Sequence, residues 1–207
     1  LMRSSAASDV YKRQEYARAK YLGRVFQDPM KGTAAGMEIQ ENLALAYRRG
    51  KKRGLKWAIG KDEQVFYKEQ LKALDLGLED RMTSKVGLLS GGQRQALTLL
   101  MATMVPPDLL LLDEHTAALD PGTADKVLKL TQEIIEKNHT ACLMVTHNMQ
   151  QALSMGNRTL MMDDGKIVLD VEGKERENMT VTDLLEKFHT KAGKDLDNDR
   201  ILLSMGK

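Results

Sequence analysis

A turn of small and polar residues that leads directly into a helix constrains this chain more than any other feature. Residues 89–95 read Leu-Ser-Gly-Gly-Gln-Arg-Gln, and the apolar pattern over residues 93–104 predicts a helix. Neither glycine carries a Cβ, so the backbone of the turn can approach an anion closely. Free N–H groups and the macrodipole also favour negative charge at a helix N-terminus. The turn is therefore predicted to bind an anion.

An acid-tipped strand follows this helix. Pro106 and Pro107 end the helix, and four consecutive leucines at residues 109–112 predict a buried strand. Asp113 and Glu114 stand at the carboxyl end of that strand, where α/β proteins place their chemistry. Neighbouring side chains of an extended strand point to opposite sides, so the two carboxylates are expected to take different roles.

Three further motifs occur in a fixed order around these two. Residues 25–29 read Val-Phe-Gln-Asp-Pro, residues 118–121 read Ala-Leu-Asp-Pro, and residues 145–148 read Val-Thr-His-Asn. They resemble, in this order, the Q-loop, the D-loop and the switch-histidine loop of the ATP-binding-cassette (ABC) transporter ATPases. The glycine turn resembles the signature motif of the same family, and we call it the signature turn; the strand that ends in Asp113 and Glu114 also fits the family. The resemblance covers about residues 21–170. It implies an α/β fold of the P-loop NTPase type, with a mostly parallel, incomplete sheet and an inserted α-helical signature subdomain.

The resemblance also implies a role for each motif. ATP and Mg²⁺ are the implied cofactors, and a second copy of the domain would contribute its signature turn to the bound γ-phosphate. Carboxylates suit Mg²⁺, and a positioned carboxylate can activate the attacking water. The implied assignments are Glu114 as general base, His147 and Gln27 as further catalytic residues, Asp113 and Gln27 toward the metal, and Ser90, Gly91, Gly92, Gln93 and Asp120 at the nucleotide.

One family motif is absent from the sequence. No Gly-x-x-x-x-Gly-Lys-Ser/Thr loop occurs, although such a loop cradles the β- and γ-phosphates in P-loop proteins. In the family it lies upstream of the Q-loop, and only 26 residues precede Gln27 here. We therefore expect the chain to be an N-terminally truncated cassette that lacks its Walker A part.

The expected domain organisation follows from this interpretation. Residues 1–14 include a stretch that resembles a translated sequencing-adapter end, and the alternative is a genuine disordered tail. Residues 15–207 are expected to form a partial ABC ATPase domain, with a helical subdomain over about 38–104 and a polar C-terminal extension over about 172–207.

Local patterns predict the remaining elements. Strands are expected at residues 21–26 and 141–146, helices at 38–47, 62–76, 121–138 and 182–189, and a hairpin turn at Asp163-Asp164-Gly165. In the second of these helices Val65, Phe66, Leu71 and Leu74 are expected to share one side. Asp120 is expected to cap the helix that begins at Pro121.

The apolar run at residues 141–146 is typical of a strand covered on both faces. In the family topology, however, its neighbour is the phosphate-loop strand. Without that strand, residues 141–146 would form an exposed apolar edge. The chain as written is then expected to be poorly stable and to bind nucleotide weakly.

Composition and charge narrow the class of protein. The chain is 42% hydrophobic and 29% charged, which fits a cytosolic globular protein. Its net charge of +2 argues against a dedicated nucleic-acid binder, and the single Cys142 excludes a disulfide framework. The basic run at residues 48–57 is interpreted as a solvated surface or, alternatively, as a contact with lipid phosphates or an acidic membrane partner.

Single histidines carry less information. His115 replaces a proline common in the family and is interpreted as backbone-level variation, with a metal-ligand role as the less favoured alternative. His139 and His189 are interpreted as structural.

The function implied by the resemblance is ATP hydrolysis that drives a membrane importer, with a bacterial uptake system for amino acids or similar solutes as the closest match. The implied partners are a second ATPase subunit in a head-to-tail dimer, transmembrane permease subunits and an extracytoplasmic solute-binding protein, at the cytoplasmic face of the membrane. No nucleic-acid partner is expected. The alternatives are a soluble ABC ATPase of translation or DNA repair, and a fragment without function of its own.

Overall fold

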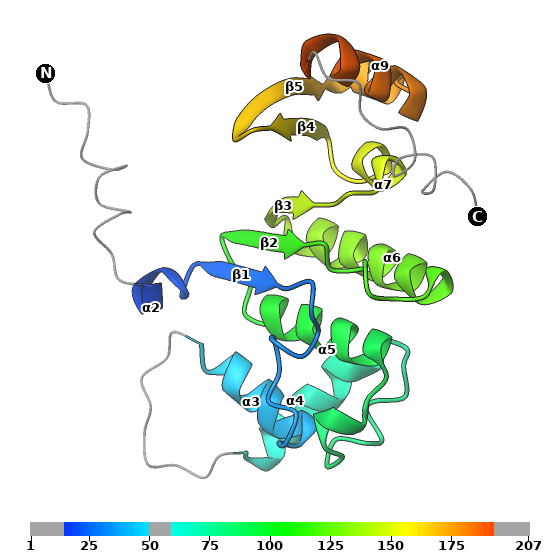
Figure 1. Ribbon diagram of the computed structural model, residues 1–207. Helices are drawn as coiled ribbons and strands as arrows, with labels where there is room; N and C mark the ends of the chain where they lie inside the picture. Colours follow the sequence, from blue (N-terminus) through cyan, green and yellow to red (C-terminus); the bar gives the residue numbers. More distant parts are fainter. Residues whose placement is uncertain (1–14, 50–58, 193–207) are drawn as a thin grey trace, which may run out of the picture. The chain divides into compact units, whose positions relative to one another are not determined.

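The computed structural model describes residues 15–49 and 59–192. The chain divides into two compact units at the junction between Val145 and Thr146, and each is described by itself. The first begins with a short helix, α2 (Glu15–Arg18), and holds the sheet and the signature helix (Figure 1). Residues 1–14 and 50–58, which include the adapter-like segment and much of the basic run, lie outside the described residues.

A three-stranded parallel sheet forms the centre of the first unit. Its strands are β1 (Leu22–Val25), β2 (Leu109–Asp113) and β3 (Ala141–Val145), in the order β1-β2-β3. The four leucines form β2, and Asp113 is its last residue, as the sequence predicts. All three strands are parallel, so their carboxyl ends lie at one edge of the sheet, and the Q-loop and the acid pair follow β1 and β2 there.

Two helices cover one face of this sheet, as Figure 1 shows. They are α5 (Gly91–Thr103) and α6 (Pro121–Asn138), and α6 has the predicted bounds. Gly23 allows α5 to pack closely, because a Cβ there would lie 2.9 Å from the carbonyl oxygen of Ala102. The buried residues of this layer are Val25, Leu99, Ala102, Leu110 and Leu112.

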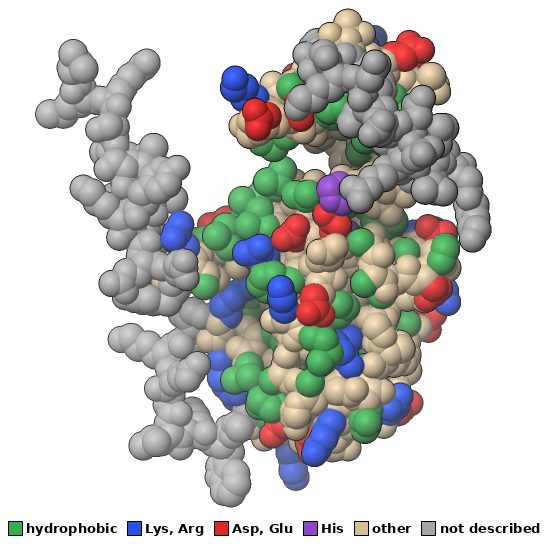
Figure 2. Space-filling view, in the orientation of Figure 1, with side chains coloured by type: hydrophobic (Ala, Val, Ile, Leu, Met, Phe, Trp, Pro, Cys, Tyr) green, Lys and Arg blue, Asp and Glu red, His purple; other side chains and the backbone are tan. Residues whose placement is uncertain are grey.

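Strand β3 is exposed in the described part of the chain, so the prediction of cover on both faces is wrong. Leu143 is 52% exposed and Val145 is similarly open, and Figure 2 shows hydrophobic side chains at the surface over this edge. The second expectation, an exposed apolar edge, is confirmed. The physical reason is that, among residues 15–49 and 59–192, β3 pairs on one side only, with β2, and helices α5 and α6 cover one face.

A helical layer lies between β1 and β2 in sequence. It consists of α3 (Ile39–Tyr47), α4 (Lys61–Lys72), the 3₁₀ turn η1 (Val86–Leu88) and α5, packed around Ile39, Leu43 and Leu97. The prediction for one side chain of α4 is wrong: Val65 is 60% exposed, whereas Tyr67 is fully buried in its place. Tyr67 stacks edge-on against Tyr47, and burial, with Glu63 nearby, raises the pKa of Tyr67 to about 12.

The described end of the basic run is structural. Arg48 forms an ion pair with Glu63 at 3.0 Å. Arg49 donates to the carbonyl oxygens of Ala102 and Val105 and so ties the end of α3 to the end of α5. Burial lowers the pKa of Arg49. The interpretation of the run as a solvated surface is therefore wrong for Arg49.

The second unit is a small α/β layer. Its elements are α7 (Met149–Ser154), β4 (Arg158–Asp163), β5 (Lys166–Glu172), α8 (Gly173–Glu177) and α9 (Val181–Ala192), with Leu169, Val171 and Leu184 buried. The predicted Asp-Gly hairpin is confirmed, since Asp164 and Gly165 have φ values of 49° and 75° between antiparallel strands. Helices α7 and α8 were not predicted. Within the described ranges, no helix combines the length and apolar character needed to cross a bilayer.

Candidate active site

A direct hydrogen bond joins the Q-loop to the acid pair. Gln27 follows β1 and Glu114 follows β2, and the Gln27 Nε2 donates to the Glu114 Oε2 at 2.9 Å across 87 residues of sequence. The parallel pairing of β1 with β2 brings the two strand ends together, with Val25 opposite Leu112. We call Gln27, Asp113 and Glu114 the acid cluster.

Glu114 departs from the strand conformation. Its φ of 45° lies in the left-handed region, which is uncommon for a residue other than glycine. Its backbone N–H donates to the carbonyl oxygen of Val145 at 3.0 Å, which holds the residue at the end of β3. The expectation that Asp113 and Glu114 separate by simple strand alternation is therefore wrong, because the chain turns at Glu114.

Asp113 lies on the open face of the sheet, where Arg24 pairs with it at an N···O distance of 3.3 Å. Both side chains are about half exposed, so this ion pair is weak. The donor set fits Mg²⁺, which is usually held by one or two carboxylates together with phosphate oxygens and water. Asp113 and the Gln27 amide oxygen are the residues that would hold it. Among the described residues there is no cluster of three or more His, Cys, Asp or Glu side chains suited to a metal.

The glycine turn is the first turn of α5 itself. The helix begins at Gly91, two residues earlier than predicted, and Ser90 is its N-cap. The Gln93 N–H donates to the Ser90 Oγ at 3.2 Å, and the Ser90 N–H donates to the Gln93 Oε1 at 3.2 Å. The N–H groups of Gly91 and Gly92 take no part in this reciprocal capping, and first-turn N–H groups have no partner within their own helix.

The second glycine of the turn also permits a close helix contact. A Cβ on Gly92 would lie 2.1 Å from the Cγ2 of Thr123 in α6, whereas a Cβ on Gly91 would lie 3.6 Å from Leu119. Asp120 caps α6 as predicted and accepts from the Thr123 N–H at 3.1 Å. Hydrogen bonds from Thr123 lower the pKa of Asp120. The structure therefore brings the signature turn and the D-loop together.

His115 is a buried structural residue. It is 2% exposed, and its Nε2 lies 3.1 Å from the Oγ1 of Thr131 in α6. Burial lowers the pKa of His115 to about 4. The side chain therefore fixes the segment after Glu114 to α6, a packing role that the interpretation as backbone-level variation did not include.

His147 belongs to the second unit and follows β3 directly. Its neighbours are tightly held: Thr146 Oγ1 accepts from the Asn148 N–H at 3.0 Å, and Asn148 Oδ1 accepts from the Gln151 N–H at 3.0 Å. Asn148 is thus the N-cap of α7. His147 itself is exposed beside this capped turn.

Two buried amides that hold the segment after β1 were missed from the sequence. Gln95 of α5 is fully buried, and its Nε2 donates to the carbonyl oxygen of Phe26 at 3.3 Å. Asn42 of α3 accepts from the Ala34 N–H at 2.8 Å and donates to the Ala34 carbonyl oxygen at 3.2 Å. Both hold the loop that contains Gln27. The sequence offers no local signal for either residue, because charged residues stand directly before both of them.

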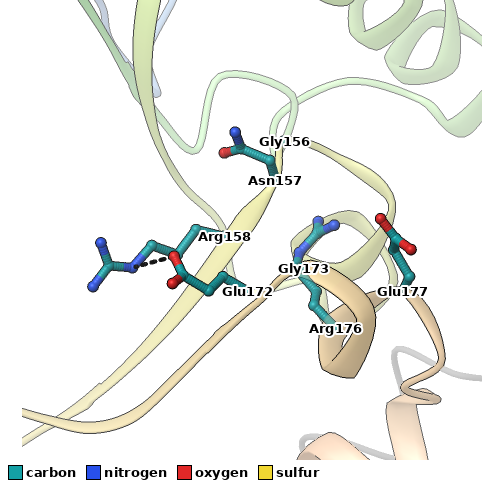
Figure 3. A pocket seen from close by; sticks show the side chains of 7 residues that line it. All are labelled: Gly156, Asn157, Arg158, Glu172, Gly173, Arg176 and Glu177. Atoms are coloured by element: carbon teal, nitrogen blue, oxygen red, sulfur yellow. Dashed lines mark ion pairs between the residues drawn. The ribbon is translucent and has the colours of Figure 1, made fainter.

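A separate cavity of about 750 Å³ lies in the second unit (Figure 3). Arg158 and Glu172 form an ion pair at 3.8 Å on its wall. Arg176 is 7% exposed and donates to the Thr159 Oγ1 at 2.9 Å and to the Met155 carbonyl oxygen at 2.5 Å. None of the predicted site residues lines this cavity, and Arg176 uses its charge to hold the end of α7.

Comparison with known proteins gives one consistent result. A family model described as "ABC transporter" matches residues 4–117. A tyrosine transport ATP-binding protein of Clostridioides difficile is 46% identical over 174 residues, which cover 84% of this chain and 69% of that protein. A methionine import ATP-binding protein of Streptococcus agalactiae is 37% identical over 165 residues, 77% of this chain and 43% of that protein.

Solved structures agree. An ATP-binding cassette determined as a dimer in a post-hydrolysis state with ADP and Pi matches with a TM-score of 0.62 and 28% identity, over 76% of this chain and 65% of that one. A second cassette of an ABC transporter, in its ADP conformation, matches with a TM-score of 0.65 at 22% identity and supports the fold. The chain therefore spans only part of the length of these relatives: 69% of the tyrosine transport protein, 43% of the methionine import protein and 65% of the dimeric cassette.

Proposed function

Because this chain belongs to the ABC transporter family and is part of an ABC-type ATPase, we propose that it serves a bacterial amino-acid importer. ATP hydrolysis at the acid cluster would supply the energy, and a permease in the membrane would carry the solute. The tyrosine and methionine relatives support this choice of solute class. The site of action is then the cytoplasmic face of the membrane.

The hydrogen bond between Gln27 and Glu114 is the observation that carries the catalytic part of the proposal. It holds a carboxylate beside an amide at the carboxyl edge of a parallel sheet, where a triphosphate can bind. Glu114 takes the proton of the water that attacks the terminal phosphorus, as the phosphoanhydride bond breaks and ADP leaves. Gln27 keeps the Glu114 carboxylate in one orientation.

Charge at the site also fits a phosphate substrate. Mg²⁺, when bound, would neutralise phosphate charge, and Asp113 with Gln27 would hold it. The Arg24 pair with Asp113 is exposed and weak, so it is readily exchanged for the metal. His147 would contact the γ-phosphate from its position after β3.

The signature turn is proposed to act on a second copy of the subunit. Gly91 and Gly92 present first-turn N–H groups, which favour a phosphate anion, and Gln93 would lie near the ribose. The relative solved as a dimer with ADP and Pi supports a dimer, which we propose to be head to tail. Asp120, beside the turn through Thr123, would carry the D-loop function at the dimer interface.

The test is transport itself. The intact subunit is purified with its permease and solute-binding protein and placed in lipid vesicles, and uptake of labelled tyrosine and methionine is followed with ATP or ADP. The proposal predicts uptake of one amino acid with ATP only. A subunit that purifies with ribosomes or DNA and with no membrane protein would refute the importer and favour the soluble ATPase.

A further inference from the structure

Gln95 connects the signature helix to the Q-loop. It is fully buried in α5, three positions after Gly92, and its Nε2 donates to the carbonyl oxygen of Phe26 at 3.3 Å. That carbonyl belongs to the peptide bond between Phe26 and Gln27. The amide of Gln95 therefore acts on the backbone plane that carries Gln27.

The same side of α5 holds the rest of this loop. Gly32 lies so close to Thr98 that a Cβ there would be 2.4 Å from the Thr98 Cγ2. Arg94 contacts the Sδ of Met30 and donates to the Leu89 carbonyl oxygen at 3.1 Å. Positions 94, 95 and 98 thus face the segment from Phe26 to Gly32.

Gln95 is an unusual choice for packing alone. Its Oε1 is buried and has no hydrogen-bond partner in the described part of the chain. A buried polar atom without a partner is costly, and an apolar side chain of the same shape would avoid that cost. The donor end of the amide is therefore the part that the position requires.

The chain of contacts continues to the base. Gln95 holds Phe26, the next residue is Gln27, and Gln27 donates to Glu114 at 2.9 Å. Two hydrogen bonds and one peptide unit thus link the helix that begins with the signature turn to the carboxylate of the same chain.

We propose that Gln95 is a positioning residue for hydrolysis: it fixes the Phe26 carbonyl and through it orients Gln27 toward Glu114. The inference rests on the function proposed above for Gln27 and Glu114. It also makes the signature helix sensitive to the Q-loop position, so a shift of either one changes the orientation of the base in the same subunit.

The test is a double-mutant cycle in the intact, assembled ATPase. Gln95→Met keeps the length of the side chain and removes the donor, and Gln27→Ala removes the residue through which Gln95 acts. Because misplacement by about 1 Å can cost up to about a hundredfold in rate, Gln95→Met is expected to lower kcat between about tenfold and a hundredfold. The dissociation constant for ATP should stay within about twofold. In the Gln27→Ala background, Gln95→Met should cause no further loss of kcat.

Thr103→Val is the matched control, since Thr103 is buried in the same helix and its hydroxyl donates only within that helix, to the carbonyl oxygens of Leu99 and Leu100. It should leave kcat unchanged. Equal losses of kcat from Gln95→Met in both backgrounds would overturn the proposal, because Gln95 would then act independently of Gln27. An unchanged kcat in Gln95→Met would also overturn it. In either case a large loss in Glu114→Gln would leave the proposed function standing.

Discussion

Replacing each signature glycine by alanine separates packing from phosphate binding. A Cβ on Gly92 would lie 2.1 Å from the Thr123 Cγ2, which is 1.3 Å short of the 3.4 Å at which ordinary contact begins. A Cβ on Gly91 would lie 3.6 Å from the Leu119 Cδ2, within ordinary contact. The two glycines are neighbours in the same helical turn, but only Gly92 lacks room for a Cβ.

The expected magnitudes follow from this difference. Overpacking costs about 1–3 kcal/mol, and alanine recovers up to about 1 kcal/mol over glycine in a helix. Gly92→Ala should therefore destabilise the subunit by about 1–2 kcal/mol, which lowers its Tm by about 2–8 °C. Gly91→Ala should leave Tm unchanged or raise it slightly. The Thr123 side chain is restrained, because its hydroxyl as well as its backbone N–H makes a hydrogen bond with the Asp120 carboxylate.

The assay is a thermal melt of the intact subunit with a rescue variant. Thr123→Ser removes the Cγ2 methyl and retains the hydroxyl, so Gly92→Ala combined with Thr123→Ser should regain most of the lost Tm. If Gly92 also meets a phosphate, turnover should stay low in the rescued variant. Equal Tm values for the two alanine variants, or no rescue by Thr123→Ser, would refute the packing argument.

Three further predictions concern the rest of the chain. Cys142 is an exposed residue of the edge strand β3, but it pairs with the buried Leu110, and partial burial raises the pKa of its thiol to about 11. The rate of its alkylation by iodoacetamide at pH 8 should thus be about a hundredfold lower than in the urea-unfolded chain, and this rate should reach half its maximum near pH 11. Equal rates in the folded and unfolded chains would place the thiol in solvent. Arg176→Met should destabilise the second unit by about 2–3 kcal/mol by leaving the Met155 carbonyl oxygen unpaired, while Arg158→Met at the exposed ion pair should have little effect. Hydrogen exchange in β4 and β5 distinguishes the two variants, and equal protection of these strands in both variants would contradict the role of Arg176. Asn42→Ala should lower the free energy of unfolding by about 1–3 kcal/mol, since the Ala34 N–H loses its acceptor. Gln132→Ala on the exposed side of α6 is the control. Thermal melts of the two variants that coincide would show that the loop does not depend on Asn42.

Much of the fold could be predicted because local signals agreed with the packing. Helix α6 has a capping Asp120, a first-turn Pro121 and a regular apolar period, so its bounds were predicted correctly. The hairpin of β4 and β5 was found because Asp164-Gly165 suits a turn with positive φ at both residues. The motif order located the acid pair at a strand end.

The remaining features depend on tertiary contacts. Helices α7 and α8 are only six and five residues long, too short for an apolar period to show. Tyr67 replaces Val65 in the core because it stacks against Tyr47, a contact that no spacing rule reveals. Gln95 and Asn42 are polar residues that bond to distant backbone groups, and a hydrophobic pattern treats both as surface positions. The left-handed φ of Glu114 follows from its bond to Val145.

The rate of ATP hydrolysis by Glu114→Gln in the intact, assembled subunit shows whether Glu114 is the general base. This change keeps the shape of the side chain and removes the proton acceptor. We predict a fall in kcat of at least about a hundredfold, with the dissociation constant for ATP within about threefold of the wild-type value. A variant that hydrolyses ATP at the wild-type rate would contradict this prediction, because Glu114 could then not be the base.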